Sequence, residues 1–175
     1  MEQSVSYTSR HDIEVHSFPL AVSIGVPALA IFFQAFVPLR MPFFRIFDLP
    51  LLVTIYFAVA RRNPMTGTFT GAIIGTLQDA LTHQPIGIFG VAKTLVGYIA
   101  SSIGVKIDVE NPGSRLGMIF GFSLLHDAVR YLIASRILGT GDVLYRSRYE
   151  LESAIANAML GLVLFMLLDR LKQRR

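Results

Sequence analysis

Residues 18–39 read FPLAVSIGVPALAIFFQAFVPL, a run with no charged side chain and a proline, Pro27, in its interior. The hydrocarbon core of a bilayer is about 30 Å thick, and a helix needs about 20 apolar residues to cross it. The run is long enough to do so, and Pro27 predicts a kink within it. Acidic residues precede the run in place of the basic region of a signal peptide. The stretch therefore predicts a transmembrane helix.

The composition of the whole chain agrees with a membrane protein. Of 175 residues, 53% are apolar and 16% are charged, and the mean hydropathy is +0.54. The net charge of +4 comes from single bases scattered between uncharged runs, so we expect no nucleic-acid partner. The chain has no cysteine, which excludes disulfides, thiolate metal sites and cysteine nucleophiles.

Six hydrophobic runs can be drawn, and they predict an all-α integral membrane protein with six transmembrane helices. The runs cover residues 18–39, about 48–60, 64–82, 85–105, 115–138 and 147–171. The second is short, and both a full span and a re-entrant segment are open for it. Asn63 with Pro64, Ser114, and Ser147 with Glu150 are expected caps of the third, fifth and sixth helices. Residues 1–17 and a basic segment at 172–175 are expected to be tails of this single domain.

The distribution of bases predicts the orientation, because Lys and Arg accumulate on the cytoplasmic side. With six spans, both termini and the even loops share one side. That side would hold Arg10, Arg61, Arg62, Lys106, Arg115, Arg170, Lys172, Arg174 and Arg175, against Arg40, Arg45, Arg146 and Arg148 on the other. Both termini are therefore expected in the cytoplasm.

Polar residues inside the predicted spans are the main functional candidates, because an ionisable group in a bilayer is costly unless it is paired or wetted. They form a predicted intramembrane layer of Asp79, Lys93, His126, Asp127, Arg130 and Asn157. We expect Asp79 to pair with Lys93, and Asp127 with Arg130 at i,i+3, as structural ion pairs. A ligand site or a proton pathway is the alternative.

Glycines recur at helical spacing on two spans. Gly67, Gly71 and Gly75 lie four residues apart on the third, and Gly117 and Gly121 do so on the fifth. Small residues let helix backbones approach closely in lipid. We expect each face to pack against another helix of this chain, and binding of a partner is the alternative.

The segment around residues 40–47 combines bases with aromatic rings, namely Arg40, Phe43, Phe44, Arg45 and Phe47. Such residues anchor at the headgroup level, so we expect an interfacial segment on the outer surface, which could also touch a partner.

Catalytic motifs are missing from the sequence. No nucleophile elbow, HExxH or phosphate-binding loop is present. Ser123 precedes His126 by three residues, but a serine hydrolase takes its nucleophile and base from different elements. We expect neither enzymatic activity nor a cofactor.

Residues 71–100, GAIIGTLQDALTHQPIGIFGVAKTLVGYIA, resemble the signature of the rod shape-determining protein MreD family. In that family a glycine-spaced helix ends in Asp, a short turn with Pro and Gly follows, and the next helix carries a Thr-Leu-Val-Gly-Tyr-like segment. The matching positions are Gly71, Gly75, Asp79, Pro85, Gly87, Thr94, Gly97 and Tyr98. Asp48-Leu49-Pro50 also resembles the opening of that family's second span. Lys93 departs from the pattern, which is commonly apolar or small there.

The resemblance implies a multi-pass protein of the bacterial inner membrane that acts in cell elongation. Its implied partners are the bitopic protein MreC and, directly or through MreC, the peptidoglycan synthases RodA and penicillin-binding protein 2, all within the lipid bilayer. It also implies a fold similar to the substrate-binding subunits of energy-coupling-factor transporters. That similarity supplies the alternative function, a vitamin or micronutrient carrier.

Overall fold

The computed structural model describes residues 18–104, 111–136 and 147–171, and this part of the chain consists of helices and short connections, without a strand. The elements are α1 (Leu20–Arg40), a short 3-10 helix η1 (Pro42–Ile46), α2 (Leu49–Arg61), α3 (Pro64–Leu81), α4 (Ile88–Ile103), α5 (Pro112–Arg136) and α6 (Ser147–Asp169). The predicted all-α class is confirmed. The predicted tails, and Lys106 and Arg146 of the charge count, lie outside the described residues.

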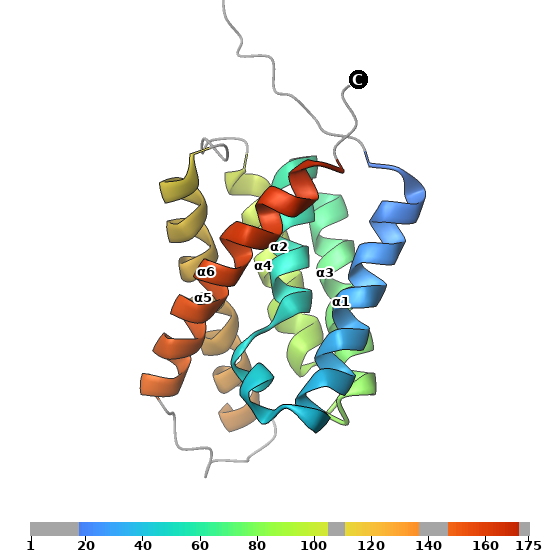
Figure 1. Cartoon of the computed structure of the whole chain (residues 1–175). Helices are drawn as coiled ribbons and strands as arrows, with labels where there is room; N and C mark the ends of the chain where they lie inside the picture. The colour runs from blue at the N-terminus through green and yellow to red at the C-terminus, as the bar shows by residue number, and fades with distance from the viewer. Residues whose placement is uncertain (1–17, 105–110, 137–146, 172–175) are drawn as a thin grey trace, which may run out of the picture.

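The six α-helices run alternately up and down in one bundle (Figure 1). The end of the bundle at which α1 begins and α6 finishes is called the tail end below. The opposite end carries η1, the α3–α4 turn and the beginning of α6, and is called the η1 end. Both described chain ends therefore lie at the tail end, as an even number of alternating helices requires.

Helix α2 forms the centre of the bundle. It has 13 residues, so it is about 20 Å long, and every residue from Pro50 to Ala60 is buried. It runs from the η1 end to the tail end, so the chain crosses the bundle here and does not turn back (Figure 1). Its apolar run is short because surrounding helices cover it, whereas a lipid-facing helix must match the bilayer thickness.

The outside of the bundle is apolar. Helices α1, α5 and α6 are long and apolar enough to cross a membrane, whereas α2 and α4 are shorter apolar helices. Large apolar side chains are exposed around the bundle, among them Leu20 at 76% and Phe69 at 63%. An apolar surface of this extent is unfavourable in water and favourable in lipid, so the chain is a membrane protein.

Local capping explains where the helices start. Asn63 caps α3 as predicted, accepting the Thr66 amide at 3.1 Å. Helix α5 begins at Pro112, earlier than expected. Asn111 accepts the Gly113 amide at 2.8 Å, so the predicted cap at Ser114 is wrong. Asparagine followed by proline is a sufficient helix start, and one glycine in the first turn does not interrupt it.

Candidate functional site

The first part of the site is the α3–α4 hairpin, in which the two backbones touch. A methyl group added to Gly71 would overlap the backbone of Lys93, and one on Gly75 would overlap the backbone at Phe89 and Gly90. Gly67 meets Gly97 of α4 in the same way. The glycine face of the third predicted span therefore packs within the chain, as expected.

The second glycine pair behaves differently. Gly117 and Gly121 on α5 are exposed, and a methyl group on either would meet no atom of the described chain within 4 Å. The same four-residue spacing thus produces a packed face on α3 and an open face on α5. Spacing alone does not reveal what covers a helix.

Asp79 closes the hairpin by capping α4. Its carboxylate accepts the amides of Gly87 at 2.8 Å, Phe89 at 3.0 Å and Gly90 at 3.1 Å, and the side chain is fully buried. Gly87 adopts a left-handed φ of 109°, which favours glycine and turns these amides toward Asp79. A carboxylate at a helix N-terminus satisfies free amides and complements the helix dipole.

The predicted Asp79–Lys93 ion pair is therefore wrong. Lys93 is also fully buried, and its Nζ donates to Asp48 Oδ2 at 2.7 Å. Asp48 in turn caps α2 by accepting the Leu51 amide at 2.9 Å. Asp48 was missed as an intramembrane acid because it stands just before its helix. The Asp-Leu-Pro start was the available signal.

The other predicted polar residues continue from Lys93 as one chain of contacts. Lys93 Nζ lies 3.2 Å from His126 Nε2, and His126 Nδ1 lies 3.1 Å from Asp127 Oδ1. An ammonium group only donates hydrogen bonds, so Nε2 accepts and the proton on Nδ1 is donated to Asp127. Asp127 also pairs with Arg130 at 3.2 Å, as predicted. The two acids and two bases cancel, with Asp48 in the place expected for Asp79.

Phe89 is the apolar centre of this polar layer. Its ring stacks on His126 at a centroid distance of 5.8 Å, and Lys93 Nζ and the Arg130 guanidinium lie 4.7 Å and 4.9 Å from its centre. Cations over an aromatic face are stabilised by the ring quadrupole. No motif in the sequence indicates this role.

Helix α6 connects the layer to η1. The Asp48 amide donates to Asn157 Oδ1 at 2.9 Å, Ser153 Oγ donates to the Ile46 carbonyl at 2.6 Å, and Tyr149 Oη donates to the Arg45 carbonyl at 3.1 Å. Asn157 thus belongs to the layer, as expected. It acts on backbone rather than on a charged side chain.

The predicted interfacial segment folds as the end of α1 followed by η1. Phe43, Phe44 and Phe47 contact one another with centroids 5.8 to 6.4 Å apart, and Phe43 is 71% exposed. Arg40 and Arg45 are exposed beside them. The segment has the exposed ring and bases that an interfacial contact needs.

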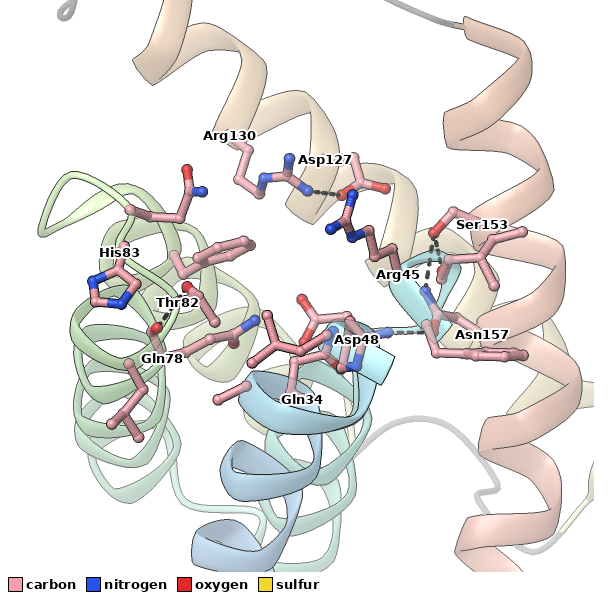
Figure 2. A pocket seen from close by; sticks show the side chains of 18 of the residues that line it. Gln34, Arg45, Asp48, Gln78, Thr82, His83, Asp127, Arg130, Ser153 and Asn157 are labelled. Atoms are coloured by element: carbon pink, nitrogen blue, oxygen red, sulfur yellow. Dashed lines mark hydrogen bonds and ion pairs between the residues drawn. The ribbon is translucent and has the colours of Figure 1, made fainter. Parts of the chain in front are cut away.

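A cavity of about 710 Å³ lies between η1, the C-terminal ends of α1 and α3, and the facing parts of α5 and α6 (Figure 2). Asp48, Asp127, Arg130 and Asn157 line it, so it opens directly onto the polar layer. Its volume is within the range of small-molecule sites. The sequence did not predict it.

Comparison with known proteins decides the family. The family model described as rod shape-determining protein MreD matches residues 16–172. The chain belongs to the MreD family. No curated protein and no solved structure matches it.

The structure gives the MreD-type signature of this chain a physical meaning. Gly71, Gly75 and Gly97 are the positions at which α3 and α4 touch, and Asp79 with Gly87 forms the cap. Thr94 Oγ1 donates to the Gly90 carbonyl at 2.7 Å. The matching residues thus describe one tightly packed hairpin. They do not include Lys93, which departs from the pattern and pairs with Asp48 of the matching Asp-Leu-Pro segment.

A second polar network of this MreD-family chain lies at the tail end. Arg115 pairs with Asp169 at 2.7 Å, and Tyr56 Oη donates to Asp169 at 3.2 Å. Arg115 was counted among the loop bases, yet it is buried where α5 meets α2 and α6. The position of Arg115 in the first turn of α5 explains this, because a base there can reach the last turn of an antiparallel neighbour.

Proposed function

We propose that the chain is a non-enzymatic membrane scaffold of the bacterial rod complex. In this proposal it binds MreC and, directly or through MreC, supports peptidoglycan synthesis by RodA and penicillin-binding protein 2. Membership of the rod shape-determining family is the observation that carries the proposal.

The arrangement of side chains supports a scaffold over an enzyme. The charged side chains of the polar layer pair with one another or cap helices, and these contacts hold the helices in place. Lys93 and Asp48 form an ion pair, and Asp48 also caps α2. Among the residues that the structure describes, Ser123 Oγ is buried without a hydrogen-bond partner, so His126 does not activate it. A serine nucleophile requires a base within hydrogen-bond reach.

We further propose six spans in the inner membrane with both termini in the cytoplasm. The alternating helices and the excess of bases at the tail end support this orientation. The chain has no natural cysteine, so single cysteines at Gly113 and Ile86, both exposed and at opposite ends, report sidedness directly. An impermeant thiol reagent added to intact spheroplasts should label Ile86→Cys and spare Gly113→Cys. The reverse pattern would overturn the orientation.

The open face at Gly117 and Gly121 is the proposed contact for the single membrane helix of MreC, because small residues permit close helix approach in lipid. Gly121→Leu should leave the folded yield unchanged and reduce recovery of MreC. Gly25→Leu is a matched control, since Gly25 on α1 is equally open. Equal recovery of MreC by both variants would remove this face from the proposal.

Cell shape tests the function itself. Depletion of the protein in its own rod-shaped host should produce round cells, and re-expression of the wild-type chain should restore rods. Gly75→Leu, which should disrupt the hairpin, is expected to fail in this rescue. Depleted cells that stay rod-shaped would contradict the proposal.

The energy-coupling-factor type of carrier is the second candidate, and one observation favours it. A carrier needs a ligand-sized cavity near the outer surface, and the 710 Å³ cavity lies at the η1 end. Recovery of a paired ATPase module with the purified protein would support transport. Its absence, together with recovery of MreC, would support the scaffold.

A further inference from the structure

A buried hydrogen-bond acceptor lines the cavity at the η1 end. Gln78 of α3 is only 2% exposed, and its Oε1 has no hydrogen-bond partner in the described part of the chain. Its side chain lines the cavity and points toward it (Figure 2). A buried acceptor without a donor is destabilising, and native proteins rarely retain one. A ligand that brings an N–H or O–H group would satisfy it.

The opposite wall offers cations. Arg130 lies on α5 across the cavity from Gln78, and its side chain is 37% exposed although it also contacts Asp127 (Figure 2). Arg45 of η1 also lines the cavity and is exposed. Guanidinium groups recognise phosphate and carboxylate oxygens through several parallel hydrogen bonds. This wall therefore suits an anionic group.

The carboxylates of the lining limit which anion can enter. Asp48 is neutralised by Lys93, whereas Asp127, which pairs with Arg130, is also hydrogen-bonded to Glu150 of α6, a further acid in the wall. A purely anionic ligand would meet Glu150 unfavourably. A ligand that carries an ammonium or hydroxyl beside its anionic group would match both kinds of residue.

The depth of the site fits a headgroup. Gln78 is three residues from the end of α3, Glu150 three from the start of α6, and Arg130 six from the end of α5. At 1.5 Å per residue these side chains start about 5 to 9 Å inside the helix ends. That is near the boundary between the headgroup layer and the hydrocarbon core.

We propose that this cavity binds a zwitterionic group of the phosphoethanolamine type, with its phosphate toward Arg45 and Arg130 and its ammonium donating to Gln78. The group can arrive as a phosphatidylethanolamine headgroup or as a free soluble compound. Choline analogues carry the same phosphate but have no N–H, so they separate recognition of the donor from recognition of the anion.

The test uses the full-length protein purified in detergent and measures its thermal unfolding midpoint with two soluble probes. Glycerophosphoethanolamine should raise the midpoint by about 5 to 10 °C at a hundred times its Kd, and glycerophosphocholine should raise it clearly less. Gln78→Leu should abolish the difference between the probes without lowering the midpoint of the unliganded protein. Ser123→Ala is the matched control, because Ser123 Oγ is also buried and has no partner within residues 18–104, 111–136 and 147–171, but it does not line the cavity.

Native mass spectrometry of protein extracted from mixed vesicles distinguishes the source. Retention of phosphatidylethanolamine over phosphatidylcholine in the wild type, lost in Gln78→Leu, would assign the site to a lipid even if the soluble probe is weak. Arg45→Gln changes an exposed residue, so the variant should fold, and it should reduce the binding of both probes. It therefore tests the site independently if Gln78→Leu does not fold. The proposal is overturned if ethanolamine and choline compounds act equally, or if neither the soluble probe nor the lipid is bound.

Discussion

The packing of the α3–α4 hairpin makes a quantitative prediction for Gly75→Ala. A Cβ atom at residue 75 would lie 2.7 Å from the Cα atom of Gly90, whereas carbon atoms in contact are about 3.5 to 4.0 Å apart. The atoms it meets are backbone, so no side-chain rotation relieves the overlap. The two helices must separate by about 1 Å, and this movement also pulls the Gly90 amide away from Asp79.

The expected loss follows from two opposing effects. Overpacking of a well-packed interface costs about 1 to 3 kcal/mol, and alanine gains up to about 1 kcal/mol over glycine in helix propensity. Gly75→Ala should therefore be destabilised by about 1 to 2 kcal/mol. Gly121→Ala has the same propensity gain and no overlap, so it should be neutral or slightly stabilised.

Reversible unfolding of the detergent-purified variants measures both changes under identical conditions. We expect Gly75→Ala to unfold first, with Gly71→Ala close to it, and Gly121→Ala to match or exceed the wild type. Equal stability of Gly75→Ala and Gly121→Ala would show that α3 and α4 do not touch at these glycines.

Three further predictions concern the polar networks. Lys93→Met should cost about 3 to 5 kcal/mol, more than Asp79→Asn, because it leaves the Asp48 carboxylate without its positive partner. Adding Asp48→Asn should recover part of this loss, and additive losses in the double mutant would refute the pair. Asp79→Ala should cost about 1 to 3 kcal/mol in the same unfolding assay because it leaves the buried Gly90 amide without its acceptor, and an unchanged stability would show that Asp79 does not cap α4. Arg115→Gln should cost about 1 to 3 kcal/mol in the same unfolding assay, and an unchanged midpoint would show that its pairing with Asp169 is not structural.

The helices could be predicted from the sequence because each one depends on local features. The run at 18–39 and the Asn63-Pro64 start fix α1 and α3 almost to the residue. The predicted start of α5 is too late because Asn111, Gly113 and Ser114 are typical of a turn, whereas Asn111 caps the helix. Span length was the weaker criterion, since α2 is shielded by its neighbours and needs only 13 residues.

Partners within the polar layer could be predicted only where they are close in the sequence. The Asp127–Arg130 pair lies within one helical turn and was found. Lys93 and Asp48 are 45 residues apart, and only the packing of α2 against α4 brings them together. Asp79 was the expected partner of Lys93 although it lies shallower, because the turn that delivers three amides to Asp79 is a tertiary feature that the sequence does not reveal. The cavity likewise depends on how η1 and α6 meet, which no single segment encodes.

Co-purification from the membranes of the native host tests the proposed scaffold most directly. The protein would carry an affinity tag at one terminus, and the recovered complex would be quantified by mass spectrometry, with Gly75→Leu as a misfolding control. We expect stoichiometric recovery of MreC, a single-span protein with a periplasmic coiled coil, together with smaller amounts of RodA and penicillin-binding protein 2. Recovery of an ATPase module in place of MreC would contradict the scaffold and support the carrier.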